Sequence, residues 1–179
     1  MMKIQTAGVF TMPADDYHAD PCPTPSLSSS GARTLLRPGG PALFRYQADH
    51  GAKHAAHYDV GHVAHALLLG VGMQVVEVEA LDWKTKAAQE KRKDAYAAGL
   101  VPLLSATLRQ VEEMVRVARE NPVVAEVLTG GRAEVSGYVL HEQTWTMLRA
   151  RYDYLREESP GEFLFVDYKT TTDASQGAF

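Results

Sequence analysis

Acidic and basic side chains near the end of the chain have types and spacings that suit metal-dependent hydrolysis. Asp153, Asp167 and Lys169 fall within residues 145–171, a stretch whose pattern predicts two β-strands joined by a polar turn. A hard cation such as Mg²⁺ binds one or two protein carboxylates together with phosphate oxygens of a substrate. Asp153 and Asp167 would be the ligands, and Lys169 would orient the attacking water and offset charge on phosphorus. This combination is typical of metal-assisted phosphodiester hydrolysis.

The alternation of residues within the two strands decides which side chains share a face. In the first strand, residues 147–155, one face carries Met147, Arg149, Arg151 and Asp153. The second strand, residues 163–170, is almost wholly apolar before Asp167, which predicts a strand buried on both faces. Period two places Asp167 and Lys169 on the same side of it.

A chance origin of the Asp-x-Lys motif has to be weighed, because the chain contains the motif twice. Asp82-Trp83-Lys84 opens a charged, helix-like segment without an apolar strand before it. The buried-strand context favours Asp167 and Lys169 as the functional pair. The alternative is a domain in which such charges merely form surface salt bridges.

Composition indicates one ordinary globular domain spanning residues 1–179. The chain is 45% hydrophobic and 22% charged, and its net charge is −4, which gives no overall basic footprint for coating nucleic acid. Cys22 is the only cysteine, so an internal disulfide, a cysteine-based zinc site and an iron–sulfur cluster are excluded. No apolar run is long enough for a membrane span and no signal peptide is evident, so we expect a cytoplasmic protein without membrane contact.

The periodicity predicts an α+β fold with a helical part at residues 1–131 and a catalytic strand meander at residues 132–172. The segment 12–25, rich in Pro and Asp, is expected to be an exposed loop. Helices are predicted at 28–37, 42–48, 59–69, 83–99, 105–120 and 122–128, and strands at 3–10, 73–81, 133–141, 147–155 and 163–170. The last three strands are expected to form an antiparallel meander.

Further polar residues are candidates for the site or for DNA contacts. Arg33, Arg37 and Arg45 could contact phosphate, with a solvated basic face as the alternative. Glu134 joins the candidates if its face of the meander is the one that carries Asp153. His65 projects from the apolar face of its helix. A zinc site of His57, His62 and His65 lacks a completing ligand, and a lone buried histidine is the ordinary alternative.

Taken together, these motifs resemble the PDDEXK superfamily of nucleases, and within it the exonuclease VIII (RecE-like) group of phages and bacteria. The resemblance covers nearly the whole chain. YDVGHVAHALLLG is similar to the group's glycine-x-x-x-histidine helix, with Gly61 and His65 in place. EVSGYVLHEQTWTMLRARYDYL resembles the strand pair that carries an acidic residue and the first core aspartate, and FVDYKTT resembles the Asp-x-Lys strand.

The resemblance implies roles for these residues. His65, Asp153 and Asp167 would hold Mg²⁺, with Mn²⁺ as a substitute; Lys169 would serve the water, and Glu134 would support the site. Arg33, Arg37, Arg45, Arg149 and Arg151 are the candidate DNA contacts. The expected activity is a Mg²⁺-dependent exodeoxyribonuclease acting on double-stranded DNA ends in recombination or phage replication. A single-strand annealing protein and a second copy of the chain are candidate partners.

One departure concerns the end of the chain. The family's core continues past the Asp-x-Lys strand into a further helix and strand, whereas ten residues follow Lys169 here. The final core helix and strand are therefore expected to be missing. The alternative function is a truncated, catalytically inactive remnant that binds DNA or a protein partner. The CRISPR adaptation branch of the superfamily is disfavoured because its four cluster cysteines are absent.

Overall fold

The computed structural model describes residues 3–51, 56–171, 173, 175 and 177. It divides into two compact units, each built from two stretches of the chain. The first unit comprises residues 1–54 and 132–155, and the second comprises residues 55–131 and 156–179. Each unit is described by itself.

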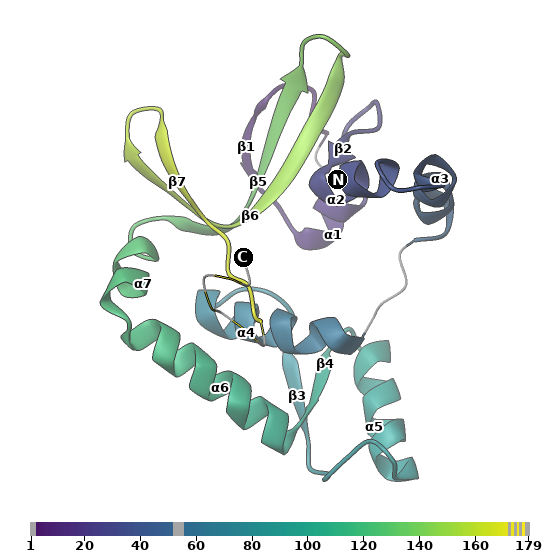
Figure 1. The fold of residues 1–179 in the computed structure, drawn as a ribbon, viewed down its shortest axis with the longest axis vertical. Coiled ribbons are helices and arrows are strands. Elements are labelled where there is room, and N and C mark those ends of the chain that lie inside the picture. Colours follow the sequence, from purple (N-terminus) through teal and green to yellow (C-terminus); the bar gives the residue numbers. More distant parts are fainter. Residues whose placement is uncertain (1–2, 52–55, 172, 174, 176, 178–179) are drawn as a thin grey trace. The chain divides into compact units, whose positions relative to one another are not determined.

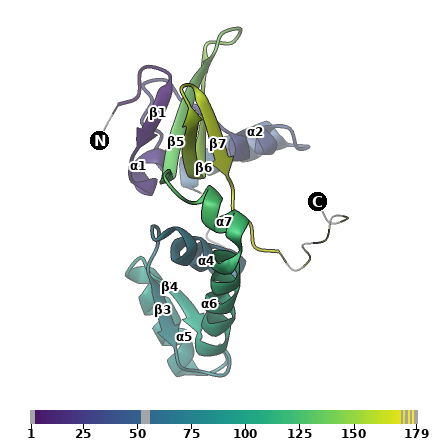
Figure 2. The same cartoon turned by 90° about the vertical axis from the view of Figure 1, so that its left-hand side faces the viewer.

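The first unit is built on an antiparallel sheet (Figures 1 and 2). Its central strand β5 pairs with β1 on one side and with β6 on the other, and the two-residue strand β2 runs parallel to β6. The strands are β1 (Gly8–Thr11), β2 (Leu27–Ser28), β5 (Arg132–His141) and β6 (Thr146–Ser159). The predicted pairing of residues 133–141 with residues 147–155 is confirmed.

Among its described residues, 3–51 and 132–155, the first unit has three helices, and the first of them lies where an exposed loop is predicted. They are α1 (Ala14–His18), α2 (Ser29–Leu35) and α3 (Gly40–His50). The loop prediction is wrong because Met12 and Tyr17 are buried with Ile4 and Tyr138 in this unit's core. Apolar contact with the sheet therefore overrides the local Pro and Asp signals. The predicted serine cap of the second helix is confirmed, since the Ser28 hydroxyl accepts a hydrogen bond from the Gly31 amide.

The second unit packs helices against a two-stranded parallel sheet (Figure 1). Its elements before residue 132 are the 3₁₀ turn η1 (Ala56–Tyr58), α4 (Asp59–Leu69), β3 (Val75–Val78), α5 (Lys86–Ala97), β4 (Val101–Leu104), α6 (Ser105–Glu120) and α7 (Pro122–Val127). The predicted helices at 59–69 and 105–120 are confirmed to the residue. β4 is not predicted, because Pro102 within VPLL argues against a strand.

The core of the second unit forms where α4, β4 and α6 meet. The fully or nearly fully buried side chains are Val63, Ala64, Leu68, Val101, Leu103, Leu108, Val111 and Val115. Those from α6, Leu108, Val111 and Val115, come from the apolar stripe that predicts this helix, whereas Val101 and Leu103 come from β4. Each large aliphatic side chain contributes roughly 1.5–3 kcal/mol through burial. This core fixes the position of α4, the helix that carries His65.

The final strand is shorter and more exposed than its sequence predicts. β7 (Glu162–Val166) pairs with β6 after a turn at Gly161, whose φ of 84° suits glycine. The prediction of a strand over residues 163–170 buried on both faces is wrong, since Phe163 and Phe165 are 41% and 52% exposed. A run of apolar residues indicates that a strand can be buried on both faces, but burial also requires other elements to pack on those faces.

No helix among the described residues has the length and apolar character that crossing a membrane requires.

Candidate active site

Glu134 and Asp153 lie opposite each other on β5 and β6. The register pairs Ala133 with Tyr154 and Val135 with Tyr152, which leaves Glu134 facing Asp153 across the two strands. Arg151 lies two residues before Asp153 on β6, and therefore on the same face, and it binds the Glu134 carboxylate. This contact places the Glu134 carboxylate on the face that carries Asp153, which is the condition under which Glu134 joins the candidate site. Both side chains are partly buried.

The backbone at Glu134 departs from an ordinary strand. Its φ is 55°, in the left-handed region that non-glycine residues rarely occupy. Such a conformation costs of order 1–3 kcal/mol and persists only where surrounding contacts hold it. Here the contact is an ion pair, in which Arg151 donates to the Glu134 carboxylate from Nε at 3.1 Å and also from Nη2.

Arg149 and Arg151 fasten the N-terminal segment to this face of the sheet. Arg149 Nη1 lies 3.1 Å from a carboxylate oxygen of Asp20 and donates to the Tyr17 carbonyl oxygen at 2.9 Å. Arg151 Nη1 donates to the Met12 carbonyl oxygen at 3.2 Å. The two arginine side chains are only 13% and 16% exposed. Their guanidinium groups thus have internal partners, whereas a phosphate contact at these positions stays a prediction from the sequence.

Tyr17 lies between these arginines and the core of the first unit. The Arg149 and Arg151 guanidinium carbons are 5.0 and 5.8 Å from the centre of its ring, within the range of cation–π attraction. Burial raises the pKa of Tyr17, although the two positive charges oppose the rise. Burial, reinforced by the same two charges, lowers the pKa of His18. Tyr17 is therefore a neutral phenol beside two arginines that are each paired with a carboxylate.

Asp167 and Lys169 follow β7 in a segment without regular secondary structure. They form an ion pair with each other while their side chains are 65% and 66% exposed. Tyr168 between them packs against the core of the second unit, and burial raises its pKa. The Asp-x-Lys motif is thus anchored by its middle residue and presents its two charged groups to solvent.

Helix α4 lies beside the same segment. A Cβ at Gly61 would lie 3.4 Å from the Thr170 hydroxyl oxygen, which is ordinary contact distance. His65 follows Gly61 by four residues, so the two residues lie on the same side of the helix. His65 is partly buried. Within the second unit, the predicted histidine and the predicted Asp-x-Lys motif therefore come from elements that touch.

The predicted metal ligands are divided between the two units. Asp153 belongs to the first, and His65 and Asp167 belong to the second. Among the residues that the structure describes, no three His, Cys, Asp or Glu side chains gather as a metal-binding group. The carboxylate oxygens and imidazole nitrogen are nevertheless a donor set that Mg²⁺ or Mn²⁺ accepts. The alternative zinc set includes His57, whose side chain lies outside the described residues.

The second Asp-x-Lys motif has a different setting. Asp82 and Lys84 precede α5 in a turn, where the Asp82 carboxylate accepts a hydrogen bond from the Lys84 amide at 2.8 Å. The Lys84 ammonium lies 3.5 Å from the other carboxylate oxygen. This pair has the same residue types as Asp167 and Lys169, and its local turn geometry explains it fully. It serves as a matched control.

Arg33, Arg37 and Arg45 lie on a helical hairpin made by α2 and α3. All three side chains are exposed, and Arg45 pairs with Asp49 at 2.8 Å on the surface of α3. The hairpin is tight because a Cβ at Gly40 would lie 2.2 Å from the Thr34 carbonyl oxygen, which no side chain could tolerate. The close approach fixes the spacing of the three cations.

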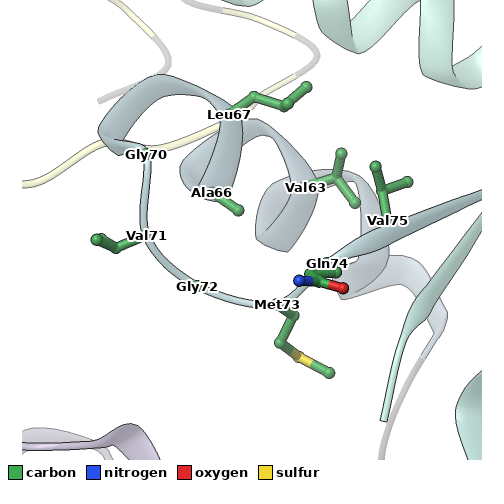
Figure 3. Close-up of a pocket in the computed structure, with 9 residues that line it drawn as sticks. All are labelled: Val63, Ala66, Leu67, Gly70, Val71, Gly72, Met73, Gln74 and Val75. Carbon is green, nitrogen blue, oxygen red and sulfur yellow. The ribbon is translucent and has the colours of Figure 1, made fainter. Parts of the chain in front are cut away.

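A pocket of about 560 Å³ lies at the end of α4 in the second unit (Figure 3). Figure 3 shows that its wall combines the last turns of α4 with the connection to β3, and Gln74 supplies the one side-chain amide on this wall. Its lining residues are Val63, Ala66, Leu67, Gly70, Val71, Gly72, Met73, Gln74 and Val75. No titratable side chain lines it, so it lacks the groups that hydrolysis requires.

Sequence reasoning missed the contribution of the N-terminal segment to this face of the sheet. Asp20 and Tyr17 are Arg149's partners from more than a hundred positions away. No local periodicity carries that information. The one available signal was the excess of Asp residues in 12–25, which is also typical of loops.

Comparison with known protein families supplies the identity that this geometry leaves open. The model of the PD-(D/E)XK nuclease superfamily matches residues 26–178. Comparison with curated proteins and with solved structures finds no match. The matched range contains β5, β6, β7 and α4, which carry the predicted acidic residues, lysine and histidine. The α+β fold, the opposed Glu134 and Asp153 and the matched range lead to one conclusion: the chain belongs to the PD-(D/E)XK nuclease superfamily.

Proposed function

We propose that this protein is a divalent-metal-dependent exodeoxyribonuclease of the exonuclease VIII type, which hydrolyses phosphodiester bonds at the ends of double-stranded DNA. The observation that carries the proposal is the register that sets Glu134 opposite Asp153, in a chain that the nuclease family matches over residues 26–178. Mg²⁺ is the proposed metal, with Mn²⁺ as a substitute. Recombination or phage replication is the proposed process.

Each candidate residue has a proposed role, which follows from the family motif that it occupies. Asp153, Asp167 and His65 hold the metal, which when bound supplies Lewis acidity at the scissile phosphate. Lys169 orients the attacking water and is exposed enough to reach a substrate. Its ion pair with Asp167 holds the ammonium beside the carboxylate that would bind the metal. Glu134 supports this group from the neighbouring strand.

Substrate binding is assigned to the exposed arginines of the α2–α3 hairpin. Arg33, Arg37 and Arg45 would contact phosphates, an interaction whose strength falls with salt. A single-strand annealing protein and a second copy of the chain are the further proposed partners, and the cytoplasm is the proposed location.

A second candidate function is a catalytically inactive remnant that still binds DNA or a partner protein. The observation that favours it is that Phe163 and Phe165 on β7 are 41% and 52% exposed, so the strand that leads to the Asp-x-Lys motif is incompletely buried. Metal binding separates the two candidates.

The test compares linear with covalently closed circular duplex DNA in the presence of Mg²⁺, Mn²⁺ or chelator. The proposed enzyme degrades the linear duplex only, and only with metal. Asp153→Asn, Asp167→Asn and Lys169→Ala should strongly reduce cleavage. Asp82→Asn and Lys84→Ala, which alter the second Asp-x-Lys motif, should leave it intact. Metal-independent DNA binding without cleavage would support the remnant instead.

A further inference from the structure

The Arg151 guanidinium is held by partners on three sides within the first unit. Its Nε and Nη2 both donate to one carboxylate oxygen of Glu134. Its Nη1 donates to the Ser136 hydroxyl at 3.0 Å and to the Met12 carbonyl oxygen at 3.2 Å. Ser136 is fully buried, so this end of the guanidinium faces the interior. All three nitrogens are therefore committed to the protein.

The main partner of Arg151 is a residue with an unusual backbone. Glu134 adopts φ = 55° within a strand, although the register on either side of it is uninterrupted. A left-handed residue turns its side chain away from the direction that the regular pleat would give. The Arg151 contact defines where the Glu134 carboxylate goes. Because Arg151 and Asp153 are two residues apart on β6, the carboxylate is kept on the face that carries Asp153.

We propose that Arg151 is a positioning residue, which holds the Glu134 carboxylate on the Asp153 face of the sheet and does not contact DNA itself. The inference rests on the proposed nuclease function, because Glu134 needs positioning only if it acts in the site. It replaces the DNA contact expected of Arg151 from its sequence. Four of the five N–H donors of this 16% exposed guanidinium are committed to Glu134, Ser136 and Met12, which leaves at most one Nη2–H for a phosphate.

The proposal separates Arg151 from an arginine that merely stabilises the sheet. The neighbouring ion pair of Asp20 with Arg149 lies in the same unit, and Asp20 has the same 22% exposure as Glu134. It does not involve Glu134. Asp20→Asn therefore weakens a comparable ion pair without touching the carboxylate in question, and it provides the matched control.

The experiment measures kcat and KM for a linear duplex, their dependence on salt and the Mn²⁺ concentration for half-maximal activity, together with thermal unfolding. The variants are Arg151→Gln, Arg151→Lys, Glu134→Gln, the Arg151→Gln/Glu134→Gln double variant and Asp20→Asn. Arg151→Gln should lower kcat about tenfold, with KM and the salt dependence of binding unchanged. Arg151→Lys should recover part of the lost kcat, because lysine keeps the positive charge but lacks the planar guanidinium that donates several hydrogen bonds at once. Adding Arg151→Gln to Glu134→Gln should cost no further activity.

Several results would overturn this inference. A raised KM with a weaker salt dependence in Arg151→Gln would make Arg151 a DNA contact. Additive losses in the double variant, or an unchanged kcat in Arg151→Gln, would remove the link to Glu134. If Arg151→Gln does not fold, the same comparisons are made with Arg151→Lys. Equal losses of kcat in Asp20→Asn and Arg151→Gln would reduce Arg151 to a stabilising role. A wild-type chain without metal-dependent cleavage overturns the proposed function itself, a distinct outcome from an active chain in which Arg151 fails these tests.

Discussion

Two ion pairs among the predicted site residues differ in how firmly the fold holds them. Arg151 and Glu134 are largely buried on neighbouring strands of the first unit, with additional hydrogen bonds to Ser136 and Met12. Asp167 and Lys169 form a solvent-exposed pair in the second unit, in a segment without regular secondary structure. The first arrangement is preorganised by the sheet, whereas the second can exchange its partner for a metal or a substrate at small cost. Variants in the two pairs should therefore separate activity from stability.

The largest effect is expected at Asp167. Asp167→Asn keeps the shape of the side chain and removes its charge, so kcat should fall by about 10² to 10³, equivalent to about 2.7–4 kcal/mol of transition-state stabilisation. Mn²⁺ binding measured by calorimetry should disappear. The melting temperature should stay nearly unchanged because the side chain is 65% exposed. Unchanged Mn²⁺ binding would remove Asp167 from the ligands.

The second-largest effect is a loss of folding stability at alkaline pH, which originates in the first unit. Burial raises the pKa of Tyr138 to about 12 from its ordinary value of 10.0. The folded chain thus keeps this proton longer than the unfolded chain, and the stabilisation is fully present below pH 10 and lost as pH rises toward 12. The free energy of unfolding should fall by roughly 2–3 kcal/mol across that window. Denaturant titrations of the wild type and of Tyr138→Phe, which lacks the ionisable group, measure the difference, and equal slopes with pH would contradict it.

A similar or smaller loss of stability is expected at Asp20. Its carboxylate accepts hydrogen bonds from the amide and the hydroxyl of Ser26, both at 2.8 Å, and pairs with Arg149. Asp20→Asn should lower the free energy of unfolding by about 1–3 kcal/mol, because it leaves a largely buried guanidinium without its charged partner. Glu113→Gln, which alters an exposed ion pair with Arg116 on α6, is the control and should leave stability nearly unchanged. Equal shifts in thermal melts would show that burial does not distinguish the two pairs.

The smallest effects are expected at the helical hairpin. Arg33→Gln, Arg37→Gln and Arg45→Gln should each weaken DNA binding a few fold and reduce the dependence of log K on log salt by about 1. Stability should not change, because these side chains are exposed. Arg109→Gln, on the exposed side of α6, provides a comparison cation. A uniform effect of all four variants would indicate nonspecific attraction.

The parts of the fold that sequence predicts well are those whose signal is local. Helices 59–69 and 105–120 match because their apolar stripes and the breaks after them lie within one window of sequence. The strand at 101–104 is not predicted, because Pro102 has a low propensity for strands although it is buried in a small parallel sheet. The last strand ends at Val166, earlier than predicted. Whether an apolar run is buried depends on tertiary packing, which the local sequence does not specify.

The candidate site also has features that local sequence predicts and features that it does not. Spacing along the strands predicts Asp153, Asp167 and Lys169 as site residues, and it makes Glu134 a candidate on the condition that it shares a face with Asp153. It does not reveal that Arg151 and Arg149 are occupied by partners inside the protein, since Asp20 lies far away in sequence. Residue type and spacing therefore indicate the chemistry, but the state of each charged group depends on neighbours that only the fold supplies.

The interleaving of the two units constrains the order in which the chain can fold. β1 pairs residue 8 with residue 138 of β5, so this pairing cannot form until residue 138 has been synthesised. At about 5–20 residues per second, that takes roughly 6–26 s, during which the N-terminal segment lacks this apolar contact. Residues 55–131, which hold the core of the second unit, are complete before that pairing begins. Folding should therefore start in the middle of the chain, and the sheet that carries Glu134 and Asp153 should close last, by a slow long-range step.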